Sequence, residues 1–144
     1  MEEQNYANHP RFVTGFHKVL FPLIAVILVG SLVNLYKSMD DPSRLYNASL
    51  ITALCVAALM QFFFSRIFPL KAQDRAIRAE ENLRHYVLTG KLLDHRVNTL
   101  QIVALRFAPD AEFPELARKA ADQGMAPKDI KLAIKAWKAD HYRV

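Results

Sequence analysis

The chain has 144 residues, of which 52% are hydrophobic and 23% are charged, and its formal net charge is +5. This length leaves room for one small domain beside membrane spans, which argues against two large domains and against a large enclosed active site. Mean hydropathy is near neutral at +0.04, so apolar residues are concentrated in one part of the chain and diluted in another. Cys55 lies in an apolar run. Because it is the single cysteine, an intramolecular disulfide is excluded.

Two uncharged stretches are long enough to cross a bilayer as helices. They cover residues 19–36 and 45–65, about 27 and 31 Å at 1.5 Å per residue. The first is too long for the apolar core of a secretory signal, and no small-x-small cleavage site follows it. Between them, at residues 37–44, Asp41 or Ser43 caps a helix and Pro42 stands near its first position. These features predict a transmembrane hairpin over residues 19–68.

The distribution of basic residues predicts how this hairpin is oriented. The connecting turn carries only Lys37 and Arg44, whereas bases crowd the end of the second span: Arg66, Lys71, Arg75, Arg78 and Arg84. Such an excess marks the cytoplasmic side. We therefore expect a multi-pass protein of the inner membrane with a cytoplasmic segment at residues 1–18, a periplasmic turn at 37–44 and a cytoplasmic helical domain at 69–144.

Residues 70–86 form a charge-dense segment that predicts a connector helix after the second span. Three acids each stand four residues before a base, the favoured order for helical side-chain pairs. Pro69 disfavours helix at Phe68, so we expect a kink or break there. The apolar residues wind onto one strip, which we expect to lie against another helix: Ala72, Ala76, Ala79, Leu83, Tyr86 and Val87.

The remaining chain reads as three short helices after a stop at Thr89 and Gly90. Asn98 or Thr99 caps the first, over residues 100–107. Asp110 caps the second, which continues to about Gln123 and is ended by Gly124. Pro127 opens a third that extends through Asp140. The predicted core consists of Leu100, Val103, Phe107, Phe113, Leu116, Ile130, Ile134 and Trp137. Because such a core is small, we expect it also to lean on the connector strip through Ala72, Ala76, Leu83 and Val87.

Eight basic residues are candidate contacts for membrane lipid or a protein partner. They are Arg66, Lys71, Arg75, Arg78, Lys128, Lys131, Lys135 and Lys138. The four lysines form a row on one face of the third predicted helix, suited to anionic headgroups. The alternative is a solvated polar face opposite Ile130 and Trp137. Nucleic-acid binding is not expected, because aromatic stacking residues are not interleaved with the lysines.

The spans contain small and polar residues suited to packing between helices. These are Gly30, Ser31, Asn34, Ser49, Thr52, Ala53 and Ala57, and the last, together with Ser49 and Ala53, forms a small-x-x-x-small ridge. If the chain turns symmetrically about Asp41 and Pro42, facing residues have numbers that sum to about 83. This register pairs Ser31 with Thr52 and Leu28 with Cys55.

The search for catalytic, cofactor and metal motifs is largely negative. The four glycines are scattered, so no phosphate-binding loop is formed. Glu81 and His85 share one helix face and come nearest to a metal or acid–base pair, helped by Asp94 and His95. Both have helical charge neighbours, which favours a salt-bridged face over a metal site. We predict no catalytic residue, cofactor or metal.

Six segments carry a resemblance to a family of small bacterial two-span membrane proteins of unknown function. They are NYANH near the start, RLYNASL at 44–50, LKAQDRAIRAEENLRHY at 70–86, IVALRF at 102–107, EFPEL at 112–116 and IKAWKADHYR at 134–143. The resemblance covers nearly the whole chain and implies a bacterial inner-membrane protein, with no functional residue to carry over. Pro69 and Pro109 depart from the family pattern and argue against continuous helix at those points.

These features predict an all-α membrane protein, a two-helix transmembrane hairpin followed by a cytoplasmic connector helix and a small helical tail domain. The expected function is that of a non-enzymatic interaction or scaffold protein, whose tail engages a protein partner or inner-leaflet lipid. One alternative is a homo-oligomeric channel-like or membrane-remodelling assembly built from the hairpins. Another is an enzyme that acts on a lipid headgroup with Glu81 and His85, although no activated nucleophile accompanies them.

Overall fold

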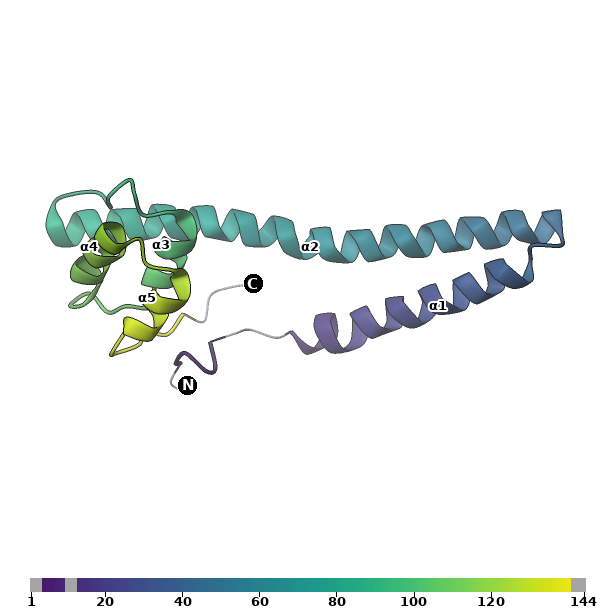
Figure 1. Cartoon of the computed structure of the whole chain (residues 1–144), viewed down its shortest axis with the longest axis horizontal. Helices are drawn as coiled ribbons and strands as arrows, with labels where there is room; N and C mark the ends of the chain where they lie inside the picture. Colours follow the sequence, from purple (N-terminus) through teal and green to yellow (C-terminus); the bar gives the residue numbers. More distant parts are fainter. Residues whose placement is uncertain (1–3, 10–12, 141–144) are drawn as a thin grey trace. The chain divides into compact units, whose positions relative to one another are not determined.

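The computed structural model describes residues 4–9 and 13–140, so part of the predicted N-terminal segment lies outside the described residues. Every regular element within the described ranges is helical, which confirms the predicted all-α class. The elements are η1 (Gly15–Leu20), α1 (Phe21–Lys37), α2 (Pro42–Thr89), α3 (Thr99–Leu105), α4 (Phe113–Gln123) and α5 (Pro127–Ala133) (Figure 1). They divide into two compact units, a helix-pair unit of Arg11–Phe68 and a tail unit of Met1–Pro10 with Pro69–Val144.

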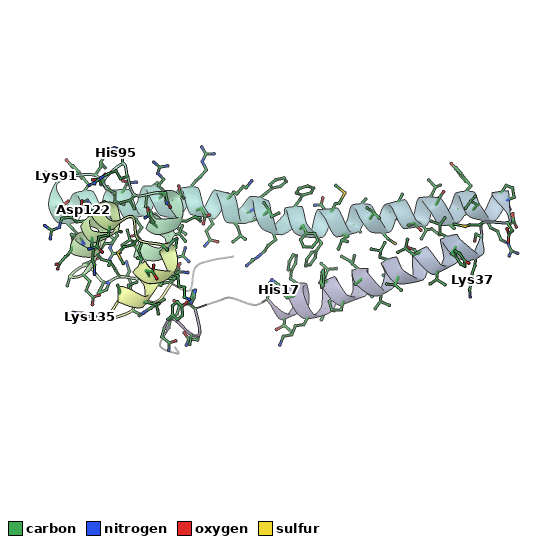
Figure 2. The ribbon with its side chains drawn as sticks, viewed as in Figure 1. His17, Lys37, Lys91, His95, Asp122 and Lys135 are labelled. Carbon is green, nitrogen blue, oxygen red and sulfur yellow. The ribbon has the colours of Figure 1, made fainter. Side chains whose placement is uncertain are left out.

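Two helical stretches are long and apolar enough to cross a membrane, by length and composition. They are Gly15–Lys37, which joins the π-helical turn η1 to α1, and α2. Pro22 stands in the first turn of α1, where a missing N–H costs little. His17 lies near the start of the first stretch and Lys37 at its end (Figure 2). Helical backbone therefore begins earlier than the uncharged run at residue 19.

The turn between α1 and α2 is closed by Asp41, one of the two predicted caps. Its Oδ1 accepts hydrogen bonds from the Ser43 backbone N at 3.0 Å and the Ser43 hydroxyl at 2.8 Å. These two bonds, and a third from the backbone N–H of Arg44, lower the pKa of the Asp41 carboxyl. The bond from the Ser43 hydroxyl has the largest effect. A carboxylate thus satisfies N–H groups that the first turn of α2 leaves open.

The helix-pair unit has a seam with the predicted register. The Thr52 hydroxyl lies 3.3 Å from the carbonyl oxygen of Ser31 and 2.9 Å from that of Ala48 in its own helix. Further along, the ring of Phe62 lies 5.4 Å from that of Phe21 and stacks on that of Phe16 at 4.1 Å. The residue numbers of two of these cross-helix pairs, Ser31–Thr52 and Phe21–Phe62, sum to 83. The seam therefore confirms the pairing of Ser31 with Thr52.

Of the kink or break predicted at Pro69, the break is wrong, because α2 runs through this proline as one helix. A proline inside a helix removes one backbone hydrogen bond and crowds the carbonyl four residues earlier, Ser65, at a cost of about 3 kcal/mol. Strong helix formers follow it, from Leu70 through the charged segment. The favourable propensity on the far side offsets the local loss, so a single proline does not end a helix of 48 residues.

The tail unit is built around a core to which all three short helices contribute. Its largest fully buried side chains are Ile102, Leu105, Phe107, Phe113 and Ile130. Several predicted ends of helices are confirmed. Asn98 caps α3 in a capping box with Gln101, Gly124 ends α4 in the left-handed conformation with φ 58°, and Pro127 opens α5.

The predicted third helix is too long, since α5 ends at Ala133 and not at Asp140. Ile134 is extended, with ψ 122°. The backbone N–H groups of Lys135 and Ala136 donate to the Glu112 carboxylate, at 3.0 and 3.2 Å. These are charge-assisted bonds, which are stronger than the helical bonds they replace. A distant carboxylate therefore turns the chain out of the helix.

Two further predictions about the tail are corrected. Asp110 does not cap α4: the residue before that helix is Glu112, which makes no side-chain cap bond, and Asp110 instead pairs with Arg84. Leu100 is not in the core, with 61% of its surface exposed. The Gln101 amide donates to the carbonyl of Met125 at 2.8 Å, and this buried bond rotates α3 so that Leu100 points outward.

The connector part of α2 buries the opposite face from the one predicted. The residues that it buries are Ile77 and Glu81, and Arg84 beside them is half-buried. The strip expected to support the core is exposed, with Leu83 at 63% and Val87 at 75%. Figure 1 shows α3, α4 and α5 gathered on one side of this part of α2. The tail thus packs on the charged face of the connector helix.

Candidate interaction surface

The eight basic residues proposed as lipid or partner contacts are divided between the two units. Arg66 is half-buried in the helix-pair unit, and the other seven belong to the tail unit. Three of these seven are exposed on the connector part of α2: Lys71, Arg75 and Arg78. They give the tail unit a cationic surface at the start of its helix.

The predicted row of four lysines on one helix is not formed. Lys128 and Lys131 belong to α5, but Lys135 and Lys138 lie beyond its end. Lys131 is half-buried, with Nζ 3.1 Å from Nε2 of His9, which comes from the N-terminal segment. The lysines are therefore separated by the turn that Glu112 imposes after Ala133.

Arg84 is the centre of a polar network that fastens the connector helix to the tail. Its guanidinium lies 2.9 Å from Oε2 of Glu81 and 2.6 Å from Oδ1 of Asp110. It also donates to the carbonyl of Ala108 at 2.8 Å and lies over the Phe113 ring at 4.4 Å. Its side chain is only 13% exposed. A planar guanidinium with its donors in a fixed fork suits such a site better than a lysine.

A cavity of about 200 Å³ opens beside this network. Its lining residues are Ile77, Glu80, Glu81, Arg106, Lys138, Ala139 and Asp140. Arg106 is buried, its Nε lies 3.0 Å from Oδ2 of Asp140, and its guanidinium stacks 4.6 Å from the centre of the Phe107 ring. Two charged groups of the cavity, the Arg106 guanidinium and the Asp140 carboxylate, are thus paired with each other.

A second, more open cavity of about 240 Å³ lies between α4 and the segment after α5. Its polar lining comes from Glu112, Glu115, Lys119 and Lys135. The Glu112 carboxylate is occupied by the two backbone N–H groups described above. This cavity is therefore lined by the carboxylate whose two hydrogen bonds turn the chain after α5.

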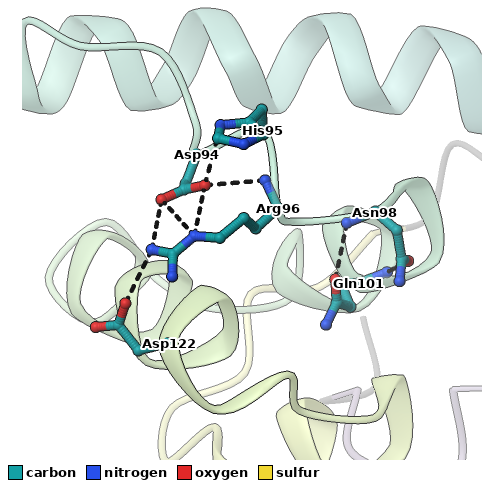
Figure 3. Close-up of polar contacts among 6 residues, drawn as sticks. All are labelled: Asp94, His95, Arg96, Asn98, Gln101 and Asp122. Carbon is teal, nitrogen blue, oxygen red and sulfur yellow. Dashed lines mark hydrogen bonds and ion pairs between the residues drawn. The ribbon is translucent and has the colours of Figure 1, made fainter.

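A third charged cluster joins the loop after α2 to α4 (Figure 3). Arg96 Nη2 lies 2.7 Å from Oδ2 of Asp94 and 2.9 Å from Oδ1 of Asp122. The hydrogen bonds from the Arg96 side chain and backbone hold the pKa of the Asp94 carboxyl well below its ordinary value. The same side-chain bonds, to Asp94 first and Asp122 second, raise the pKa of the Arg96 guanidinium.

Glu81 and His85, the nearest approach to a metal or acid–base pair in the sequence, have separate partners. Glu81 pairs with Arg84. The His85 ring donates from Nδ1 to the carbonyl of Lys91 at 2.7 Å. Within residues 4–9 and 13–140, no group of three or more His, Cys, Asp or Glu residues is arranged to hold a metal ion.

The seven small or polar span residues separate into two sets. Ser31 is buried in the seam and Thr52 is half-buried there, and the hydroxyl of Thr52 bridges the two helices. The other five are exposed: Gly30, Asn34, Ser49, Ala53 and Ala57. The seam of α2 instead buries Ala48, Cys55 and Phe62, so the ridge that includes Ser49 lies outside it.

The comparison with protein families covers the full chain. Residues 1–144 match the model described as Family of unknown function (DUF6526). The chain belongs to this family. No curated protein and no solved structure matches it.

In this DUF6526 chain, the sequence predicts that the apolar strip of the connector helix supports the tail core, whereas the structure leaves the strip exposed. Sequence periodicity finds the strip but not its exposure. The missed signal is the spacing of Ile77, Glu81 and Arg84, which places a buried isoleucine and a buried ion pair on one helix face. The charge pattern predicts a solvated side, whereas in the structure Arg84 is drawn inward by its hydrogen bonds to Asp110 and to the Ala108 carbonyl.

Proposed function

We propose that the chain is a non-enzymatic integral protein of the bacterial inner membrane, which crosses the bilayer twice and uses its tail unit as an interaction module. The observation that carries the proposal is the exposure of its apolar helices. Only 6% of the most apolar 18-residue window of Gly15–Lys37 is buried, and only 22% of the corresponding window of α2. A core helix of a soluble protein would be mostly buried, since each large apolar side chain gains about 1.5–3 kcal/mol on burial.

The outward side chains of the helix pair support an apolar surrounding. Val26 in the uncharged run of residues 19–36 and Leu54 in that of residues 45–65 are each 70% exposed. The only hydroxyl that bridges the two helices, among the contacts described, points into the seam from Thr52. Apolar groups outside and a hydroxyl inside are the arrangement expected of a helix pair in lipid.

The distribution of bases supports cytoplasmic termini and a periplasmic turn. Lys71, Arg75 and Arg78 are exposed on α2 after the second apolar run. The turn carries only two bases, Lys37 and Arg44, and Arg44 is paired with the Asp41 carboxylate at 3.2 Å. Because each base near an anionic leaflet gains about 1 kcal/mol, the three exposed bases also favour contact of the tail with inner-leaflet headgroups.

The ion pairs of the tail support a structural and binding role. Arg84, Arg106 and Arg96 each hold carboxylates that join distant segments. A general acid or base needs a group free to exchange a proton with a substrate. Charges used as bridges are suited instead to a rigid surface that a protein partner or a lipid headgroup contacts.

A second candidate is a homo-oligomeric, channel-like or membrane-remodelling assembly built from the helix pairs. The observation that favours it is the exposed ridge of Ser49, Ala53 and Ala57 on α2. Small residues at this spacing allow two helices in lipid to approach closely. A detergent-solubilised mass that corresponds to a closed ring of several copies without another protein supports this candidate, whereas a smaller species that captures a different protein through residues 70–144 supports the first.

Alkaline extraction of membranes from cells that express the full chain tests the proposal. An integral protein with two spans remains in the pelleted bilayer after carbonate treatment at high pH, whereas a peripheral protein is released. We expect the chain in the pellet, and in the soluble fraction only after detergent is added. Release by carbonate alone contradicts the membrane assignment.

A further inference from the structure

We propose that the exposed strip on the connector part of α2 binds the same strip of a second copy, so that two chains pair as a parallel coiled coil. The strip consists of Ala72, Ala76, Ala79, Leu83 and Tyr86, with Val87 at its edge. All six side chains are exposed, the last three at 63%, 54% and 75%. A continuous apolar face on a charged helix marks an interaction surface. The inference rests on the proposed membrane location for its parallel orientation.

The spacing of the strip is that of a coiled-coil seam. Its members recur at alternating steps of four and three residues, from Ala72 to Tyr86, as do the a and d positions of a heptad. Ala76 and Leu83 then occupy a positions, and Ala72, Ala79 and Tyr86 occupy d positions. Alanine in the seam lets two helix backbones approach closely, which increases dispersion contacts.

The charges beside the strip favour a second copy over an unrelated partner. In this heptad Arg75 is a g residue and Glu80 is the e residue of the following heptad, and both are exposed. In a parallel pair each g residue faces the next e residue of the other chain. Arg75 of each copy therefore meets Glu80 of the other, which gives two opposite-charge contacts by symmetry.

Among the described residues, the tail packs on a different face of α2 from the one that the second copy needs. It holds α2 through Arg84, which bonds Asp110, and through His85, whose ring lies 5.8 Å from that of Phe113. These residues fall at the b and c positions, on the outer side of a coiled coil. Two tail units can thus pair without giving up their own contacts.

Confinement in a membrane supplies what the short seam lacks. The strip covers little more than two heptads, and a helix pair of this length is marginal in water. Two chains inserted with the same orientation hold their connector helices parallel and at high effective concentration. Self-association is therefore expected for the full chain in a bilayer.

Disulfide cross-linking of the full chain in its own membranes tests the pairing. In a Cys55→Ala background, Leu83→Cys places thiols at facing a positions, and oxidation should give a covalent dimer. The matched control is Leu88→Cys, since Leu88 is also an exposed leucine, 41% exposed, but at an f position. Equal dimer at both positions, or none at 83, overturns the inference. If the chain is instead found outside the membrane fraction, the proposed function fails separately.

Charge exchange tests the facing pair directly. Arg75→Glu or Glu80→Arg alone sets like charges against each other and should lower the cross-linking at position 83 roughly threefold to tenfold. The double exchange should restore it. Residues five apart on a helix do not face each other, so a contact within one chain cannot explain this rescue. A double variant that cross-links no better than the single variants contradicts the Arg75–Glu80 contact and with it the parallel register.

Discussion

Arg84 and Asp110 are 26 positions apart in the chain, yet the guanidinium and the carboxylate meet at 2.6 Å. The two partners differ in surroundings, because the side chain of Arg84 is 13% exposed and that of Asp110 is 67% exposed. Glu81, the second partner of Arg84, is 9% exposed. The network therefore has a buried half, which is costly to disturb, and a solvated half, which is not.

Arg84→Met should destabilise the tail unit much more than Asp110→Ala. Without Arg84, the buried carboxylate of Glu81 has lost its partner, at a cost of about 3 kcal/mol. Removal of Asp110 leaves the Arg84–Glu81 pair intact and should cost about 1 kcal/mol or less. Trp137 is the only tryptophan, so its fluorescence during denaturant unfolding of the full chain in detergent reports the tail. Equal losses for the two variants would contradict the buried half of the network.

Glu112→Gln should destabilise the turn after α5 by about 1–2 kcal/mol, since the variant keeps an acceptor for the backbone N–H groups of Lys135 and Ala136 but loses its charge. Glu115→Gln is the matched control, because Glu115 lies in the first turn of α4 and has no hydrogen bond to distant backbone among the contacts of the described residues. The same fluorescence measurement should show a shift for the first variant and almost none for the second. If Glu115→Gln has the larger effect, the structural role assigned to Glu112 fails.

Acid should weaken the ion pair between Asp94 and Arg96 in the loop after α2. The bonds from Arg96 hold the pKa of Asp94 below its ordinary value of 3.8. Between these two pKa values the folded form binds fewer protons than the unfolded form, so stability is present above pH ~4 and is lost as the pH falls toward the folded pKa.

Denaturation of the full chain in detergent between pH 2 and pH 6 checks the acid dependence. Asp94→Asn should be less stable than the original chain at pH 6, and the difference should shrink as the pH falls toward 2. A constant difference between the two proteins across this range would mean that the charge of Asp94 plays no part.

The register of the helix pair predicts an intrachain disulfide. Leu28 is half-buried and Cys55 is buried on the same seam as Ser31 and Thr52, and their numbers also sum to 83. Leu28→Cys should therefore oxidise to a bond with Cys55 within one chain, detected by mass spectrometry after blocking of free thiols. Val29→Cys, whose parent side chain is 62% exposed, should not. Equal oxidation of both variants would place the seam elsewhere.

Local sequence signals predicted much of the fold because the atoms involved are close along the chain. Asp41 accepts from residues two and three positions ahead, and Asn98 and Gln101 complete their own capping box. Gly124 supplies the left-handed residue that ends α4. The pairing of Ser31 with Thr52 also followed from sequence, since a short turn between two straight helices fixes which residues face each other.

The remaining features depend on partners that no local pattern reveals. The end of α5 depends on the Glu112 carboxylate, which lies 23 positions before Lys135. The outward turn of Leu100 depends on the bond from Gln101 to Met125, 24 positions away. The buried face of α2 depends on Asp110 and the carbonyl of Ala108. In each case a hydrogen bond to a residue distant in the sequence outweighs the apolar periodicity from which the helix end or the buried face was predicted.

The central claim, a two-span membrane protein with both termini in the cytoplasm, is tested most directly by paired reporter fusions. One reporter is active only in the periplasm and the other only in the cytoplasm, and each is fused at Asp41 and after the last residue. The account predicts activity of the periplasmic reporter at Asp41 and of the cytoplasmic reporter at the C-terminus. Activity of the cytoplasmic reporter at both positions, or the inverse pattern, would contradict it.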